Sequence, residues 1–69
     1  MRLITADGAA VSPGDTLIHV GTARGWTYVR PGVPPDPTRS PPFVGRVIMS
    51  DGDHEVEFYP QEFRLNYAE

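Results

Sequence analysis

The sequence predicts an all-β protein, a small barrel of five or six short antiparallel strands with one helical turn before the last strand and a proline-rich loop. Three observations support this fold class. Runs of β-branched and aromatic residues recur about every ten residues, turn-forming residues separate them, and no stretch shows helical periodicity. With 69 residues, the chain is expected to form a single domain over residues 1–69.

The first strand is expected at residues 3–5. A two-residue turn at Asp7 and Gly8 should follow it and place Ile4 opposite Val11. Residues 12–15 then suit a type II turn, because proline presets the second position and glycine accepts the positive φ of the third. The chain should therefore reverse twice before its second strand.

A second hairpin is expected next, with strands at residues 16–22 and 26–30 and a three-residue loop at 23–25. Residues 31–42 hold six of the eight prolines. Proline lacks the amide hydrogen that a strand ladder needs, so this segment should be a stiff loop with an extended, polyproline-like path.

The clearest local pattern is the pair of alternating runs that flank Asp51 and Gly52, which predicts a hairpin with a type I′ turn. Counting outward from that turn pairs Ser50 with Asp53, Val47 with Val56, Arg46 with Glu57, and Gly45 with Phe58. These pairs put apolar side chains on the core face and opposite charges on the other face. Residues 60–63 should then form one helical turn that begins at Pro60, followed by a last strand at 64–67.

The order of these elements resembles a known group of small barrels. The resemblance rests on residues 4–8, then Val11, Gly14 and Asp15, then residues 45–47 and the Asp51 and Gly52 hairpin. In these features the chain is similar to the SH3-like (KOW or Tudor-like) barrels common among uncharacterised proteins of actinobacteria and their phages. The resemblance implies an SH3-like fold, and it says little about an activity. The proline-rich loop departs from the pattern.

Composition excludes several classes of protein. Cysteine is absent, so disulfide bonds and thiolate metal sites are excluded. No apolar run is long enough to cross a bilayer, and the first residues lack a secretory signal, so we expect no membrane association and a cytoplasmic location. The resemblance implies that this cytoplasm is that of a bacterium or a phage-infected host cell. The net charge of −3 disfavours a duplex-DNA binder.

Nothing in the sequence points to an enzyme, and we predict no catalytic residue, cofactor or metal. His19 is expected in a strand and His54 beside a turn, both packed or solvated. Residues 51–55 gather acids and a histidine, but strand alternation separates His54 from its neighbours, so they cannot converge on one ion. Residues 34–39 match the P-x-x-P-x-R pattern of polyproline ligands, although a stiff connection is the preferred interpretation.

The seven aromatic residues are the better functional indication, because so small a barrel cannot bury them all. Strand alternation puts Trp26, Tyr28 and Arg30 on one face, which either points outward as a binding surface or points into the core. Tyr59, Arg46 and Glu57 should share a face of the later hairpin. The predicted partner-binding residues are Trp26, Tyr28, Arg30, Arg39, Phe43 and Tyr59.

The leading functional hypothesis is a non-enzymatic protein-binding or assembly module that meets a protein partner or associates with itself. A small phage protein that acts on a host factor and a structural subunit both fit this class. The alternative hypothesis is a nucleic-acid-binding barrel that uses aromatic side chains and arginines 24, 30, 39 and 46. The acids around residues 51–57 make this alternative the weaker one.

Overall fold

The computed structural model describes residues 2–68, which form six strands and one 3-10 helix. In chain order these are β1 (Arg2–Thr5), β2 (Thr16–Ile18), β3 (Gly25–Pro31), β4 (Val47–Ser50), β5 (Glu55–Phe58), the 3-10 helix η1 (Pro60–Phe63) and β6 (Leu65–Ala68). The predicted all-β fold, with a helical turn that begins at Pro60 and precedes the last strand, is confirmed.

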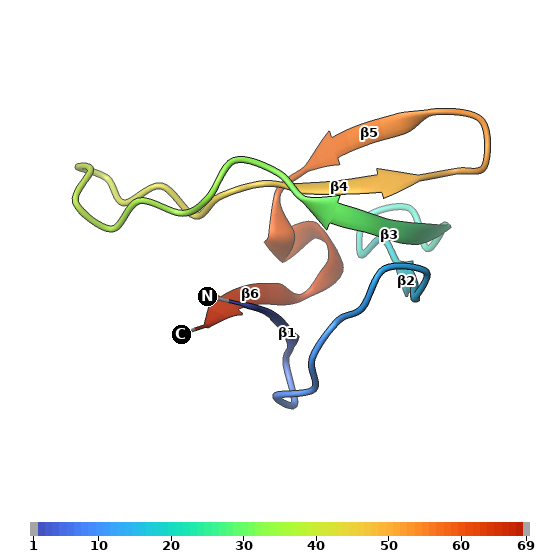
Figure 1. Cartoon of the computed structure of the whole chain (residues 1–69), viewed down its shortest axis with the longest axis horizontal. Coiled ribbons are helices and arrows are strands. Elements are labelled where there is room, and N and C mark those ends of the chain that lie inside the picture. The colour runs from blue at the N-terminus through green and yellow to red at the C-terminus, as the bar shows by residue number, and fades with distance from the viewer. Residues whose placement is uncertain (1, 69) are drawn as a thin grey trace.

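The strands form two antiparallel sheets (Figure 1). One contains β1 and β6, and the other contains β2, β3, β4 and β5 in that order. The sheets are not closed into a barrel, which differs from the prediction. They meet through η1, where the amide of Val20, just beyond β2, donates to the carbonyl of Glu62 over 2.8 Å. In residues 2–68, this hydrogen bond stands where a closed barrel would have a strand ladder.

The turn after β1 differs from the prediction by one residue, because Ile4 lies opposite Ala10 and not Val11. The amide of Thr5 donates to the carbonyl of Ala9 over 2.8 Å, which leaves a three-residue loop between them. The next turn is as predicted. Asp15 donates to the carbonyl of Ser12 over 3.0 Å, and the glycine at position 14 has the positive φ, 97°, of a type II turn.

β2 is shorter than predicted and ends at Ile18. The chain leaves the strand at His19, whose ring Nδ1 accepts the amide hydrogens of Gly21 and Thr22 over 3.1 and 3.2 Å. These bonds form a loop that returns at Arg24, and the residue at position 25 lies in β3 opposite Ile18. The predicted three-residue loop is therefore wrong, while the predicted strand at 26–30 is confirmed within β3.

The β4–β5 hairpin forms where predicted, but its register is shifted by two residues. Its pairs are Val47 with Phe58, Ile48 with Glu57, Met49 with Val56 and Ser50 with Glu55. The carboxylate of Asp51 explains the shift, since its Oδ1 accepts the amides of Asp53 and His54 and moves the turn along the chain. A shift of two residues keeps each side chain on its face, so Val47 remains in the core. Val56, also expected to be in the core, is instead exposed, because the side chains that cover β4 do not extend over this part of β5.

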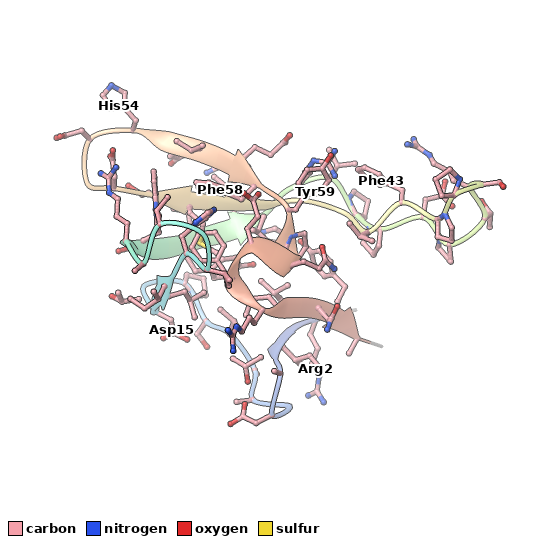
Figure 2. The ribbon with its side chains drawn as sticks, turned by 180° about the vertical axis from the view of Figure 1, so that it is seen from behind. Arg2, Asp15, Phe43, His54, Phe58 and Tyr59 are labelled. Carbon is pink, nitrogen blue, oxygen red and sulfur yellow. The ribbon has the colours of Figure 1, made fainter. Side chains whose placement is uncertain are left out.

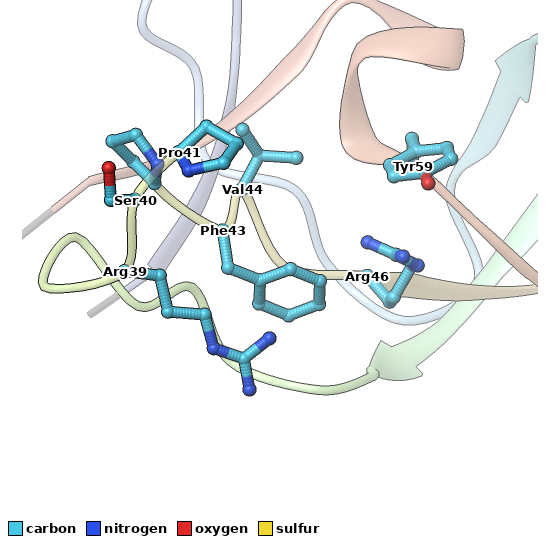
Figure 3. Close-up of a pocket in the computed structure, with 8 residues that line it drawn as sticks. Arg39, Ser40, Pro41, Phe43, Val44, Arg46 and Tyr59 are labelled. Carbon is cyan, nitrogen blue, oxygen red and sulfur yellow. The ribbon is translucent and has the colours of Figure 1, made fainter.

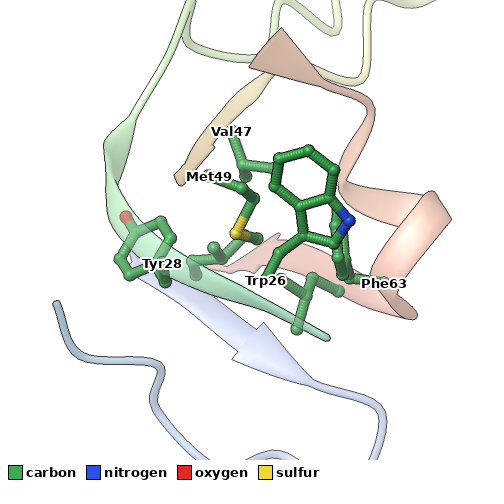
Figure 4. Close-up of a cluster of buried hydrophobic side chains, with 7 residues drawn as sticks. Trp26, Tyr28, Val47, Met49 and Phe63 are labelled. Carbon is green, nitrogen blue, oxygen red and sulfur yellow. The ribbon is translucent and has the colours of Figure 1, made fainter. Parts of the chain in front are cut away.

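The core lies between the two sheets and takes side chains from both (Figure 4). Its buried members are Leu3, Trp26, Tyr28, Val47, Met49, Phe63 and Leu65. Trp26 and Tyr28 are 9% and 4% exposed, so their outward placement is wrong. Burying these two rings removes more apolar surface from water than burying Thr27 and Val29 would.

A β-bulge separates Arg30 from the two aromatic residues. The pairing of β3 with β4 shifts between Tyr28 and Arg30, which breaks the alternation that sequence reasoning assumed. Arg30 is consequently exposed, and its Nη2 lies 2.8 Å from a carboxylate oxygen of Glu55 on β5.

Residues 32–46, here called the arm, run outward from β3 and return to β4 (Figure 1). The loop predicted at 31–42 lies in it, apart from Pro31, which ends β3. Asp36 and Phe43 exchange two backbone hydrogen bonds of 2.9 Å, which hold the outgoing and returning limbs together. Gly45, expected under Phe58, is instead buried against Tyr67 and the outgoing limb.

Candidate functional site

A hollow lies between the returning limb of the arm and the start of η1 (Figure 3). This open groove of about 520 Å³, here called the arm groove, is lined by Arg39, Ser40, Pro41, Pro42, Phe43, Val44, Arg46 and Tyr59. The peptide bond between Ser40 and Pro41 is cis. The bridge from Asp36 to Phe43 positions one wall, and β5 ends so that Tyr59 forms the opposite wall.

Arginine and aromatic side chains alternate along the arm groove. The guanidinium of Arg39 lies 4.8 Å from the centre of the Phe43 ring. That of Arg46 lies 4.6 Å from the same ring and 3.9 Å from the ring of Tyr59. Figure 3 shows these four side chains following one another along the groove. Each contact is within the range of a cation–π interaction, so the stack is ordered before any ligand arrives.

The two arginines differ in their freedom. Arg46 is 21% exposed, donates from Nη1 to the carbonyl of Gly45 over 2.9 Å, and has its Nε 3.8 Å from Glu57. The predicted pairing of Arg46 with Glu57 thus exists as a diagonal contact and not as a directly opposite pair. Arg39 is 61% exposed, and only its Nε lies near an acid, 3.5 Å from Asp36. Arg39 is therefore the cation best placed to meet a ligand.

The acid beside Arg39 accepts two hydrogen bonds within its own turn. The hydroxyl of Thr38 donates to Asp36 over 2.6 Å and its amide donates over 3.0 Å. These bonds, led by the hydroxyl and helped by the charge of Arg39, lower the pKa of Asp36 below its ordinary value. A carboxylate therefore lies beside the cation of Arg39.

The structure brings together half of the predicted partner-binding residues. Arg39, Phe43 and Tyr59 all line the arm groove, and Phe43 and Tyr59 lie on one side of the molecule (Figure 2). Arg30 lies outside this groove, paired with Glu55. Trp26 and Tyr28 belong to the core, so they are not available as a contact surface.

The predicted partner-binding residues omitted Arg46, which was named only for the nucleic-acid alternative and which joins the two rings of the groove. A signal for it was present, because the hairpin pattern put Arg46 on the same face as Tyr59. The apolar residues of the wall, Pro41, Pro42 and Val44, carried no such signal. Their position in the wall depends on the path of the returning limb of the arm. The proline content of the segment does not predict that path.

The two histidines lie apart from the arm groove. His54 is exposed in the β4–β5 turn (Figure 2). His19 is in a loop and not in a strand as predicted, and its Nε2 lies 3.0 Å from Glu62 Oε1. Because its Nδ1 accepts backbone amides, the neutral ring carries its hydrogen on Nε2 and donates it to the carboxylate. Both ring nitrogens are thus engaged in holding the loop on η1.

Comparison with protein families, curated proteins and solved structures found no match to this chain. In the described residues 2–68, no helix has the length and apolar character needed to cross a membrane.

Proposed function

We propose that the chain is a non-enzymatic protein-binding or assembly module and that the arm groove is its contact surface. The observation that carries this proposal is the stack of Arg39, Phe43, Arg46 and Tyr59, whose first and last members are exposed. Tyrosine, phenylalanine and arginine are the residues that protein interfaces favour, and ordered side chains lose little entropy when a partner binds.

The groove suits an extended protein segment that carries an acidic side chain beside apolar ones. A guanidinium whose flat face rests on an aromatic ring keeps its N–H groups in the plane, where a carboxylate can accept them. The guanidinium of Arg39 lies over the Phe43 ring, 4.8 Å from its centre, and is 61% exposed to a partner. The prolines and Val44 provide an apolar wall beside it, which an aliphatic side chain of the partner would cover.

Site-specific photo-crosslinking tests this proposal. A photoreactive phenylalanine analogue replaces Val44 in the groove, and the control replaces the exposed Ala9 in the turn after β1. We expect a discrete crosslinked protein from position 44 alone, lost when Tyr59→Ala is added. Size-exclusion chromatography with light scattering, at several concentrations, shows whether that protein is a second copy. Identical products from both positions, or a strict monomer without a specific product, would overturn the proposal.

We extend the proposal to the fold family and to the cellular location of the protein. The open pair of sheets is a variant of the SH3-like barrel, supported by the helical turn before the last strand and by the contact of the β2–β3 loop with η1. The protein works in the cytoplasm of a bacterium or a phage-infected cell, either on a host factor or as a structural subunit.

Binding of single-stranded nucleic acid is the second candidate, and the alternation of rings and guanidinium groups supports it. Two observations weigh against it: Asp36 and Glu57 flank the two arginines, and Arg46 covers part of the ring surface that a base would need. Fluorescence anisotropy with labelled single- and double-stranded oligonucleotides at low salt tests it. Binding that Arg39→Glu abolishes would favour this candidate over the protein-binding one.

A further inference from the structure

A second surface lies at the end of β2, away from the arm groove. Ile18 and Val20 are the most exposed large hydrophobic side chains among the described residues, at 56% and 51%. They line one hollow of about 290 Å³ together with His19, Ala23 and Arg64. Single exposed aliphatic residues are common on soluble proteins, but two that share a hollow form a small apolar pocket.

The backbone beside this pocket is an open sheet edge along β2, and the open part ends at Val20, whose amide donates to Glu62 of η1. β2 has only β3 as a neighbour in the described part of the chain. The carbonyl of Asp15 accepts from Tyr28, and the amide of His19 donates to Arg24, so both point toward β3. Because successive residues of a strand direct these groups to opposite sides, Thr16 and Ile18 direct theirs away from β3. An extended peptide could continue the sheet there.

The pocket also contains a free cation. Arg24, Arg30, Arg39 and Arg46 each have a carboxylate within 4 Å, whereas Arg64 has none among residues 2–68. Arg64 and Ala23 are also the only non-glycine residues of the described chain with positive φ, 57° and 59°, and both line this pocket. Arg64 is the left-handed residue that ends η1, and this conformation fixes where its side chain leaves the backbone.

We infer that the β2 edge is a docking site for an extended segment of another protein. The segment adds as a strand beside Thr16 and Ile18, places an aliphatic side chain against Ile18 and Val20, and sets a carboxylate at Arg64. Charge complementarity selects an acidic segment. A second copy of this chain could offer its own edge strand β5, in which Glu55 and Glu57 flank the exposed Val56. It fits poorly, because these two acids are already paired with Arg30 and Arg46. This site does not depend on the arm groove.

A defined peptide provides the test. The probe is acetyl-Ser-Val-Thr-Glu-Thr-Val-Ser-amide, and the control peptide has lysine in place of glutamate. The probe is titrated into ¹⁵N-labelled protein up to about 2 mM, a concentration at which a Kd of about 1 mM is detected. It should shift the amides of Thr16 and Ile18 and slow their hydrogen exchange. Unchanged spectra, or shifts confined to Val44 and Tyr59, would overturn the inference.

Two variants sharpen the result, since both change exposed side chains and their spectra report folding directly. Ile18→Thr and Arg64→Asp should each weaken the probe at least about fivefold, the effect of a modest interface residue. Arg64→Asp should also bind the lysine peptide better than the wild type does. The matched control, Val33→Thr, changes an exposed aliphatic residue of the arm and should have no effect.

If Arg64→Asp binds the glutamate and lysine peptides equally, residue 64 does not contribute to the selection of an acidic segment, which would overturn that part of the inference. Dimerisation of the wild type that Ile18→Thr abolishes would make the occupant a second copy and overturn the inference as stated. The crosslink from position 44 distinguishes the two proposals, because Ile18→Thr should leave it intact. Absence of that crosslink from the wild type, together with binding of the peptide by the wild type, would count against the arm groove and not against the β2 edge.

Discussion

The guanidinium of Arg46 lies 3.9 Å from the centre of the Tyr59 ring and joins the arm to the residue that precedes η1. The same side chain contacts Phe43 on the arm, so one arginine connects two segments that are distant in sequence. The shape of the arm groove therefore depends on this contact as much as on the prolines.

Tyr59→Leu should destabilise the protein by about 0.5–1 kcal/mol, because it removes an exposed cation–π contact and keeps an apolar side chain. Tyr59→Phe is the matched control, since it retains the ring and should change stability little. Urea denaturation of the two variants measures the difference. Equal stabilities would show that the ring of residue 59 contributes nothing beyond its apolar area.

Trp26→Ala should unfold the protein or reduce its stability severely. Replacing a buried aromatic residue by alanine costs about 3–5 kcal/mol, which is comparable to the total of about 3–10 kcal/mol expected for a chain of this length. The exposed Val33→Ala should melt as the wild type does. Circular dichroism during heating compares them, and a cooperative melt of Trp26→Ala near the wild-type temperature would contradict the packing described for the core.

Gly45→Ala and Gly8→Ala separate backbone strain from steric contact. Their φ values are nearly equal, 87° and 88°, so each variant should lose about 1–2 kcal/mol from the left-handed conformation. A Cβ at position 45 would also lie 3.0 Å from the Pro35 nitrogen and from the Tyr67 ring, whereas one at position 8 would meet nothing within 4 Å. Denaturation should therefore show the larger loss for Gly45→Ala; equal losses would argue against close packing of the arm.

The contact between His19 and Glu62 predicts a loss of stability in acid. Hydrogen bonding by His19, helped by the amide of Tyr59, lowers the pKa of Glu62 below its ordinary value of 4.5. A carboxylate with a lowered folded pKa stabilises the fold fully above 4.5, and this contribution disappears as the pH falls through the folded value.

Glu62→Gln keeps the hydrogen-bonding shape and removes the charge, so it measures this contribution. The stability difference between wild type and variant should be largest near neutral pH and should shrink below pH 4.5. Urea denaturation at a series of pH values records it. A difference that stays constant through this acid range would show that the charge of Glu62 is not involved.

Strand positions could be predicted from the sequence better than strand registers. Turn residues and alternation located the β4–β5 hairpin, but the carboxylate of Asp51 bonds two amides and moves the turn. The amides that bind the ring of His19 similarly end β2 early. Side chains that compete for backbone groups act within a few residues, and a pattern of apolar and polar positions does not record them.

The orientation of Trp26 could not be predicted because alternation defines two faces without saying which one is covered. The second sheet and η1, which cover it, come from both ends of the chain. The prediction also assumed that Trp26, Tyr28 and Arg30 share a face. The bulge between Tyr28 and Arg30 makes this assumption wrong. Part of the arm groove was predicted, since Arg39, Phe43 and Tyr59 were selected, but their meeting depends on the path of the arm.

Arg2 lies opposite Ala68 in the ladder of β1 and β6, so the two ends of the described chain meet (Figure 1). Paired strands are about 5 Å apart, and a few glycines would join these ends without strain. A circular permutant reopened at Asp53, in the exposed β4–β5 turn, keeps every strand pair but makes the β4–β5 pair the most remote in sequence. Its refolding rate, compared with that of the original connectivity, would report whether this hairpin forms before or after the barrier to folding.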